Sequence, residues 1–359
     1  MNSFSCGRIV IWLCAMVLIS CKQSDAVVVT PQSSCSIRAA DVSFLPQIEA
    51  AGVKLYNLSG EAEGMLTTLK NVGCNTIRLR LWYAPSDGHS GFAEVKSLAQ
   101  RSKALGLKVW LTVHYSDTWA DPGAQTLPGA WSSCTFDALK DSVSAYTRRV
   151  VTQMQPDYIQ IGNEINAGFL WPMGKSDHMS QFTALLDAGI KAVRASSPTS
   201  KIILHCAGIK DAQWLFSQFG SLDYDIIGIS YYPVWHGKDL DLLQSTLSML
   251  ASTYNKEVVI AETAYPFTLG WSDWTNNIVG TNDQLLSGYP ATAVGQHDFL
   301  AKIRDISSSF AKGLGFCYWG GEFIAWKGST ATDGSNWENQ AFYDFDHKAL
   351  PVLNVYGGN

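Results

Sequence analysis

Short runs of apolar and β-branched residues recur along the chain, separated by stretches in which apolar residues fall at helical spacing. Runs of four to six such residues are typical of strands that are buried on both faces. Eight of them can be read in order: Ile37–Val42, Thr76–Leu81, Lys108–Val113, Asp157–Ile161, Lys201–His205, Asp225–Ser230, Glu257–Ala261 and Leu314–Tyr318. Strands that alternate with helices predict parallel βα units, and eight such units predict one (β/α)8 barrel.

The connections between the runs predict where a functional site would lie. The clearest helical patterns precede the third, fourth and fifth runs, over 92–105, 136–150 and 182–193. Long segments rich in Trp, Gly, Asp and Asn follow the third, seventh and eighth runs, at 114–134, 263–297 and 320–343. Long loops within a compact domain usually carry function, and barrel enzymes keep their sites after the strand C-termini. No change of composition interrupts 37–355, so we expect one domain there.

Two glutamates end strands in the same way. The fourth run stops at Gly162-Asn163-Glu164, where the glycine lets the backbone turn, and the seventh run stops at Glu262. The C-terminal ends of barrel strands meet at one face, so we expect the two carboxyl groups to converge across the mouth. Carboxyl groups on both sides of a bond suit glycoside hydrolysis. The alternative is that each glutamate is a salt-bridged loop residue.

The neighbours of the two glutamates predict a division of roles. An acid must be protonated before it acts, whereas a nucleophile must be ionised and needs positive or hydrogen-bonding neighbours. Glu164 follows the neutral Asn163, which could bind a sugar 2-hydroxyl. Tyr231 and Tyr232 follow the sixth run, and one of their hydroxyls could orient Glu262. Of the possible partners, we expect Arg80, near the end of the second run, and Tyr231 to lie beside Glu262. Glu164 is therefore the predicted acid/base and Glu262 the predicted nucleophile.

Other strand ends supply further candidate substrate contacts. Arg78 and Arg80 are two apart and share a face of their strand, and a barrel-interior ion pair is the alternative role for Arg80. His114 ends the third run and could bond a sugar hydroxyl or the nucleophile, unless it is a core histidine with satisfied nitrogens. Trp319 ends the eighth run and could form an aromatic floor for the sugar at the cleavage point.

Composition excludes other classes of protein. The 359 residues are 47% hydrophobic and 16% charged, which is typical of a folded domain with a large core. The net charge of −5 offers no basic surface for phosphates, so we expect no nucleic-acid partner. Thirteen tryptophans and fourteen tyrosines would fill the core and also offer faces on which sugars stack. Nothing in the sequence indicates an assembly, and we expect a monomer.

The first residues predict export. Arg8 precedes the apolar segment IVIWLCAMVLI, which is too short to span a bilayer comfortably and is typical of a signal peptide over 1–20. It ends in Leu18-Ile19-Ser20-Cys21, which resembles a bacterial lipobox. We therefore expect Cys21 to be lipidated, 21–36 to form a tether, and the protein to sit in the cell envelope on the outer membrane, facing outward. In the alternative, the signal is an ordinary secretory one and Cys21 is incidental.

The remaining cysteines do not indicate a metal site or a disulfide framework. Five follow Cys21, an odd number without CxxC spacing: Cys35, Cys74, Cys134, Cys206 and Cys317. Three of them, Cys74, Cys206 and Cys317, lie in apolar strand contexts that predict small buried side chains. Cys35 and Cys134 could pair in an oxidising compartment, a question the sequence leaves open.

Several strings, in order, resemble glycoside hydrolase family 53, the endo-β-1,4-galactanases. They are ADVSFLPQIEAAG, NTIRLRLWYAPSDG, VHYSDTWADPGAQTLPGAW, IQIGNEINAGFLWP, AETAYPFT and GSNWENQAFYDF, and they cover about 37–350. The resemblance implies a retaining (β/α)8 enzyme that cleaves β-1,4-galactan in type I pectic arabinogalactan. It also implies an acid/base after strand four and a nucleophile after strand seven, at Glu164 and Glu262.

The resemblance also raises the question of calcium. Some bacterial members of the family carry a calcium site after strand seven, with the pattern Asp-x-Asp-x-His-x-Asn. The stretch 271–277 keeps at most Asp273 and Asn277 of that pattern. Calcium binds six to eight oxygens, several of them from carboxylates. We therefore expect no required cofactor and no calcium held in that form.

Two alternatives to galactan hydrolysis stay open on sequence alone. The carboxyl pair serves any β-linked polysaccharide, so mannan or xylan could be the substrate instead. A lipoprotein that binds glycans without cleaving them would also have an aromatic cleft and an anchor. Such a binding protein has no need of two acids whose mutual repulsion is destabilising.

Overall fold

The computed structural model describes residues 1–4 and 35–357, and 33–359 cluster as one compact unit. Cys21 and most of the predicted signal peptide and tether lie outside the described residues. Eight parallel strands form a closed barrel in which each strand pairs with its neighbour in sequence, and β8 pairs with β1. The prediction of a (β/α)8 barrel is thus confirmed. The strands are β1 Ile37–Asp41, β2 Thr76–Leu81, β3 Lys108–Val113, β4 Tyr158–Ile161, β5 Lys201–Ala207, β6 Ile226–Ser230, β7 Glu257–Glu262 and β8 Gly313–Tyr318.

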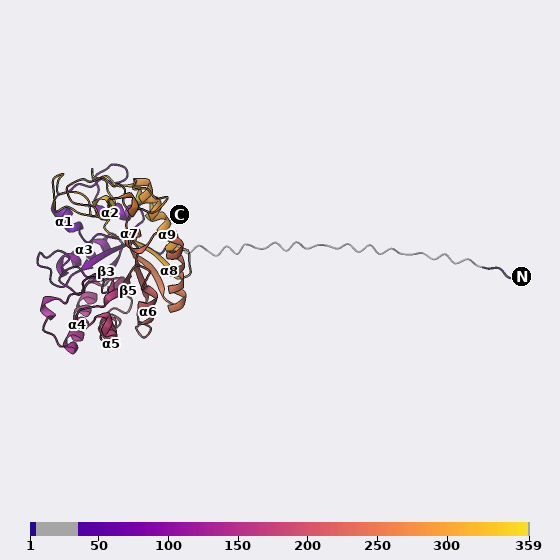
Figure 1. Ribbon diagram of the computed structural model, residues 1–359, viewed down its shortest axis with the longest axis horizontal. Helices are drawn as coiled ribbons and strands as arrows, with labels where there is room; N and C mark the ends of the chain where they lie inside the picture. The colour runs from indigo at the N-terminus through magenta and orange to yellow at the C-terminus, as the bar shows by residue number, and fades with distance from the viewer. Residues whose placement is uncertain (5–34, 358–359) are drawn as a thin grey trace. The chain divides into compact units, whose positions relative to one another are not determined.

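Helices surround the strands (Figure 1). The α-helices are α1 Leu45–Ala50, α2 Met65–Asn71, α3 Phe92–Ala104, α4 Phe136–Met154, α5 Met179–Ser196, α6 Ala212–Ser217, α7 Pro233–His236, α8 Leu240–Tyr254 and α9 Ala293–Ser308. Short 3-10 helices are η1 Gly129–Trp131, η2 Ile165–Ala167, η3 Ser176–His178, η4 Asn282–Gln284, η5 Glu338–Gln340 and η6 Pro351–Tyr356.

Helix α4 illustrates how the sequence specifies these elements. Thr135 caps its first turn by accepting a hydrogen bond from the Ala138 N–H, and Gln155 ends it in the left-handed conformation. Leu139, Val143 and Val150 are buried and recur at helical spacing, so one face packs on the barrel. The same spacing in the sequence predicted this helix.

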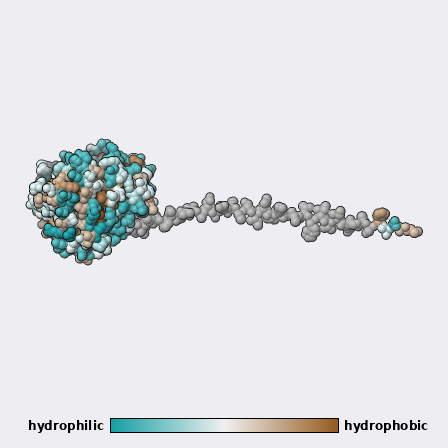
Figure 2. Space-filling model, turned by 90° about the horizontal axis from the view of Figure 1, so that it is seen from below, coloured by the Kyte–Doolittle hydropathy of each residue, from teal (hydrophilic) through white to brown (hydrophobic). Residues whose placement is uncertain are grey.

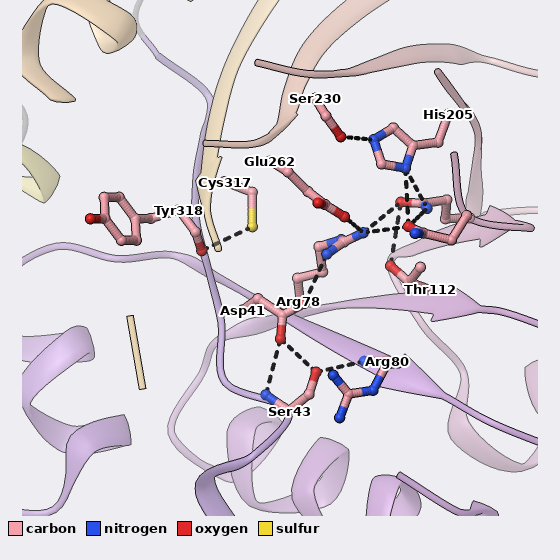
Figure 3. A network of polar contacts seen from close by, with 12 residues as sticks. Asp41, Ser43, Arg78, Arg80, Thr112, His205, Ser230, Glu262, Cys317 and Tyr318 are labelled. Atoms are coloured by element: carbon pink, nitrogen blue, oxygen red, sulfur yellow. Dashed lines mark hydrogen bonds and ion pairs between the residues drawn. The ribbon is translucent and has the colours of Figure 1, made fainter. Parts of the chain in front are cut away.

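The barrel interior contains an apolar cluster and a polar layer. The members of the apolar cluster are Ile37, Ala39, Trp110, Ile203, Ile226, Val259, Ala261 and Cys317. Towards the C-terminal ends, the inward residues are polar and bonded to one another, and Figure 3 shows Asp41, Arg78, Thr112, His205, Ser230 and Glu262 in this layer. The polar layer therefore lies beneath the face on which barrel enzymes bind substrate.

A β-bulge near the end of β7 interrupts the strict alternation of inward and outward side chains. Ile229 of β6 pairs with Ile260, but the next residue, Ser230, pairs with Glu262, so Ala261 is an extra residue. Ile260 packs in the outer core while Ala261 belongs to the interior cluster. Simple alternation would then turn Glu262 outward, towards the helices. The extra residue instead directs its side chain into the barrel.

The cysteines and the surface complete the description. Cys74, Cys206 and Cys317 are buried as predicted, and Cys35 and Cys134 are free thiols rather than a disulfide. Figure 2 shows a face of the barrel unit on which hydrophilic residues predominate and hydrophobic ones are scattered. Among the described residues, no helix has the length and apolar character needed to cross a bilayer.

Candidate active site

A cleft of about 730 Å³ opens above the polar layer, at the C-terminal ends of the strands. Both predicted catalytic glutamates line it. Five tryptophans also contribute to its walls, one after β3, one in α7 and three after β8: Trp119, Trp235, Trp319, Trp326 and Trp337. The size falls in the range of small-molecule sites, and the walls combine aromatic side chains with polar and charged ones.

The structure brings Glu164 and Glu262 together as the sequence predicted. One carboxylate oxygen of each lies within 4.8 Å of the other. Glu262 is the last residue of β7, whereas Glu164 follows β4 and precedes η2. Gly162, with φ of 78°, makes the turn between β4 and Glu164, and a Cβ there would lie 2.7 Å from Ile165 Cγ2. A side chain at Gly162 would therefore displace the segment that carries Glu164.

Glu262 is bound by two donors inside the barrel. Arg78 Nη2 donates to its Oε1 at 2.7 Å, and the Tyr232 hydroxyl donates to its Oε2 at 3.0 Å. Arg78 Nη1 also donates to Asp41 at 2.9 Å. Both acids raise the pKa of Arg78, against the opposing effect of burial, so this guanidinium stays charged. Figure 3 shows it between Asp41 and Glu262.

Within residues 35–357, Glu164 has no cationic partner at bonding distance. Its Oε1 accepts a hydrogen bond of 2.6 Å from the Ser230 hydroxyl. Burial, and then the neighbouring charge of Glu262, raise the pKa of Glu164 to about 8. At neutral pH this carboxyl group is therefore protonated, as a general acid must be.

The two carboxyl groups thus have different electrostatic surroundings. Burial also raises the pKa of Glu262, but Arg78 and the Tyr232 hydroxyl both oppose this effect. When two acids share a site, the proton resides on the one with fewer partners for its charge. Here that residue is Glu164. The geometry supports an acid at Glu164 and a nucleophile at Glu262, as the sequence predicted.

The prediction that Arg80 bonds Glu262 is wrong, because Arg78 makes this bond instead. The Arg80 guanidinium lies 4.4, 4.5 and 4.0 Å from the ring centroids of Phe44, Trp82 and Trp119 respectively. Its Nη2 donates to Ser90 at 2.8 Å, and in Figure 3 its side chain points away from Glu262. Arg80 is nearer the strand end, so its long side chain extends to the rim, whereas Arg78 reaches the carboxylates from below. Arg80 lines the cleft at its wall.

The Tyr231 hydroxyl does not bond the Glu262 carboxylate, although the Tyr231 backbone N–H donates to the Glu262 carbonyl at 2.8 Å. Its hydroxyl donates to the Gly237 carbonyl at 2.8 Å and braces the segment after β6. The next residue, Tyr232, reaches Glu262 instead. Successive residues of extended chain point to opposite sides, so a shift of one position exchanges the two roles.

Asn163 and His114 lie in the cleft as predicted. Asn163 Oδ1 accepts from Arg78 at 3.1 Å, and its Nδ2 donates to the Ala120 carbonyl at 2.9 Å, which fixes the amide orientation. His114 Nδ1 accepts from the Ala120 N–H at 3.0 Å. Burial lowers the pKa of His114 well below its usual range, so the ring is neutral and its hydrogen is on Nε2. Within the described part of the chain, His114 makes no direct hydrogen bond to Glu262.

Trp319 lines the cleft, and neighbouring rings hold it. Its centroid lies 4.6 Å from that of Trp337 and 6.0 Å from that of Trp119. The sequence assigned Arg78 no role at Glu262, and it did not single out five further functional candidates: His205, Ser230, Trp119, Trp235 and Trp337. His205 and Ser230 lie inside predicted strands, where inward-facing positions near the C-terminal end were the available signal. The tryptophans lie in the long loops or just after a strand, as Trp319 does.

Two groups of side chains bear on metal binding. In the described part of the chain, one cluster of His, Cys, Asp or Glu could hold a metal, namely Glu164, His205 and Glu262. Its histidine already has a protein partner at each ring nitrogen. In the loop after β7, Asp273 Oδ1 accepts from the Thr275 N–H, and Asn277 Nδ2 donates to the Gly270 carbonyl. Protein groups thus brace this loop, and the calcium expectation stays a prediction.

Comparison with known proteins agrees with this geometry. The family model of glycosyl hydrolase family 53 matches residues 37–356. Arabinogalactan endo-β-1,4-galactanase A of Aspergillus niger is 34% identical over 333 residues, which are 88% of this chain and 92% of that protein. The solved family 53 catalytic domain of Ignisphaera aggregans is 37% identical with a TM-score of 0.84, covering 90% of this chain and 95% of that one. A structure of fungal β-1,4-galactanases is 30% identical with a TM-score of 0.77, covering 90% and 99%. This chain belongs to glycosyl hydrolase family 53.

Proposed function

We propose that this protein is a retaining endo-β-1,4-galactanase that cleaves the galactan of type I arabinogalactan. The observation that carries the proposal is the pair of carboxyl groups in the cleft, with oxygens within 4.8 Å of each other and opposite electrostatic surroundings. Carboxyl groups about 5–5.5 Å apart leave no room for a water between acid and base, and they support attack by one of them on the sugar. The family relatives named above are endo-β-1,4-galactanases, which supports galactan as the substrate.

In the first step, Glu262 attacks the anomeric carbon while the bond to the leaving oxygen breaks. Glu164 gives its proton to that oxygen, and a galactosyl ester forms on Glu262. Arg78 and Tyr232 hold Glu262 ionised and fixed before the attack. Asn163, whose amide is fixed by Arg78 and Ala120, is placed to bond the 2-hydroxyl of the sugar.

In the second step, a water molecule attacks the anomeric carbon and the ester bond breaks. Glu164, now ionised, takes a proton from that water, and Glu262 regains its charge. The ester removes the negative charge of Glu262, which is a cause of the raised pKa of Glu164. The pKa of Glu164 therefore falls in the intermediate, which suits its change from acid to base. Two inversions return the original configuration.

Product analysis tests both the substrate and the mode of cleavage. Pure β-1,4-galactan, mannan, xylan and glucan are incubated with the enzyme, and the products are followed over time. We expect a ladder of galacto-oligosaccharides from galactan at early times. Release from mannan or xylan alone would overturn the substrate, and release of only monomer or dimer from the start would overturn endo cleavage. Binding of galactan without any cleavage would support the glycan-binding alternative.

Amide variants test the two roles. Glu164→Gln and Glu262→Gln preserve shape and remove the acid and the nucleophile, so each should lower galactan hydrolysis by at least about a thousandfold. Azide is also added to Glu262→Ala and to Glu164→Ala. The anomer of the glycosyl azide that each variant forms separates the two roles. Full activity in either amide variant would remove that residue from the mechanism.

We also propose that Cys21 anchors the enzyme to the outer membrane of a cell envelope, with the barrel facing outward. The support comes from the lipobox-like Leu18-Ile19-Ser20-Cys21 after an apolar segment. Mass spectrometry of the mature N-terminus should find a lipid-modified Cys21, and Cys21→Ala should release galactanase activity from the membrane fraction. A mature protein that begins at another residue, with no lipid, would contradict the anchor.

A further inference from the structure

His205, on the inner face of β5, is fully buried and holds both ends of Glu164. Its Nδ1 lies 3.3 Å from the backbone nitrogen of Glu164, whose N–H points at it. Its Nε2 lies 2.9 Å from the Ser230 hydroxyl oxygen, which lies 2.6 Å from Glu164 Oε1. Figure 3 shows His205 and Ser230 side by side above Glu262. One histidine therefore reaches the backbone of Glu164 directly and its carboxyl group through one serine.

The surroundings of His205 determine which ring nitrogen carries the hydrogen. Burial and the charge of Arg78 lower the pKa of His205 well below its usual range, so the ring is neutral and has one N–H. The Glu164 backbone N–H can only donate, so Nδ1 must accept. A hydrogen on Nδ1 could point at Asn163 Oδ1, 3.1 Å away, but it would oppose the Glu164 N–H. Asn163 Oδ1 already accepts from Arg78 and Gln160. The hydrogen is therefore on Nε2.

This tautomer gives the chain of hydrogen bonds a direction. His205 Nε2–H donates to the Ser230 oxygen, and the single hydroxyl hydrogen of Ser230 is then directed to Glu164 Oε1. We propose that His205 and Ser230 are positioning residues that keep Glu164 Oε1 an acceptor, so that the proton given to the glycosidic oxygen resides on Oε2. The proposal rests on the proposed function, in which Glu164 is the acid/base.

The backbone of Glu164 supports the same arrangement. Its φ of 45° and ψ of 58° lie in the left-handed region, which is uncommon for residues other than glycine. In this conformation its N–H is bonded to His205 rather than to a strand neighbour. Backbone conformations of this kind persist where surrounding contacts impose them, and they are concentrated at functional sites. The bond to His205 and the link through Ser230 are two such contacts.

The direction of the chain has a consequence for proton transfer. A hydroxyl that donates to a carboxylate stabilises the ionised form, and such charge-assisted bonds are the stronger ones. Ser230 thus opposes the effects of burial and of Glu262, which raise the pKa of Glu164. The other charged groups near Glu164 are Arg78 on β2, which lowers its pKa, and Asp121 after β3, which raises it. The Ser230 bond strengthens as the proton leaves Oε2, and it weakens again when Glu164 recovers a proton from water.

Replacing Ser230 tests the direction of its hydrogen bond to Glu164, because the two directions predict opposite shifts of the pH profile. The alkaline limb of kcat/KM on galactan reports the acid of the free enzyme. In Ser230→Ala the ionised form of Glu164 loses a donor, so the limb should move to higher pH, and kcat should fall about tenfold to a hundredfold. If Ser230 accepted from Glu164 instead, its loss would remove a partner of the protonated form, and the limb would move to lower pH. A lower or an unchanged limb would overturn the proposal.

A matched control lies in the same network. Thr112 is buried on β3, and its hydroxyl donates to Gln160 Oε1 at 3.3 Å without contacting Glu164. Thr112→Val removes one buried hydroxyl, as Ser230→Ala does, and should leave the alkaline limb in place. An equal shift in both variants would mean general disturbance of the polar layer and would overturn the assigned direction. Ser230→Thr keeps a hydroxyl, and should restore the wild-type limb if the alanine variant folds poorly.

Two further measurements separate this proposal from the proposed function. The acidic phenol of an aryl β-galactoside leaves without needing a proton. The glycosylation rate of Ser230→Ala with this substrate should therefore match that of the wild type. An equal loss of rate on galactan and on the aryl galactoside would overturn the proposal. Nitrogen-15 NMR of histidine-labelled wild-type enzyme reads the tautomer without any turnover. It should show His205 protonated on Nε2 across neutral pH, and protonation on Nδ1 would overturn the proposal. Absence of galactan hydrolysis in the wild type would refute the function while leaving the tautomer measurable.

Discussion

A buried proton on Glu164 should make the stability of the protein depend on pH in a way that Glu164→Gln removes. The pKa of Glu164 rises from its ordinary 4.5 to about 8 in the folded chain. Below about pH 4.5 both folded and unfolded chains carry the proton. Between the two values the folded chain keeps it while the unfolded chain releases it, so stability declines as pH rises through this window. Above about pH 8 the decline ends.

The size of this loss of stability follows from the rise in the pKa of Glu164. At about 1.36 kcal/mol per pKa unit, a rise from about 4.5 to about 8 amounts to about 5 kcal/mol as an upper limit. Glu164 is only partly buried and Glu262 titrates with it, so we expect about 2–4 kcal/mol. A glutamine has no proton to lose. Glu164→Gln should therefore match the wild type near pH 5 and be more stable than it near pH 9.

Denaturant unfolding of both proteins at pH 5, 7 and 9 measures this difference. Burial also raises the pKa of Glu322 to about 8, but this residue is present in both proteins and cancels in the comparison. Glu61→Gln, at an exposed position, is the control for loss of one carboxylate and should follow the wild type at every pH. If the difference between Glu164→Gln and wild type stays constant from pH 5 to pH 9, Glu164 does not hold a raised pKa and the assignment of the acid fails.

Four substitutions address other parts of the site. Arg78→Lys leaves Glu262 without its short hydrogen bond. It should lower kcat/KM about a hundredfold, measured by kinetics, and stability by about 3–5 kcal/mol, measured by denaturation. Unchanged values would refute the ion pair as the reason that Glu262 is ionised. Tyr232→Phe removes one hydrogen bond to a charged group and should lower kcat about tenfold to a hundredfold, whereas Tyr231→Phe should keep kcat, and the reverse order would restore the sequence-based assignment. Gly162→Ala meets both a left-handed backbone and a close side chain, so it should lose at least about 1–2 kcal/mol of stability together with activity, and a stable active variant would contradict the tight turn.

The sequence predicted the barrel and the positions of its two acids because both depend on local pattern. Continuous apolar runs specify strands, and a glutamate that directly follows a run must lie at the strand end. The partners of these acids depend on distances that no pattern contains. Arg78 and Arg80 share a face, and only their different depths in the barrel decide which one reaches Glu262.

Strand ends were the other source of error. Alternation of side chains specifies a face only while the strand is regular, and at Tyr231 and Tyr232 one position decides which hydroxyl enters the barrel. Buried polar residues such as His205 and Ser230 read as ordinary strand positions, because their partners come from other strands. The aromatic cage around Arg80 joins residues after β1, β2 and β3, and it too is visible only in three dimensions.

The bulge that admits Ala261 makes reactivity depend on backbone length as well as on side-chain identity. Removing that one residue would restore regular alternation and rotate the carboxylate of Glu262 out to the helical layer, although every functional group would still be present in the chain. Deletion of Ala261 should therefore abolish hydrolysis of galactan even where the barrel still folds.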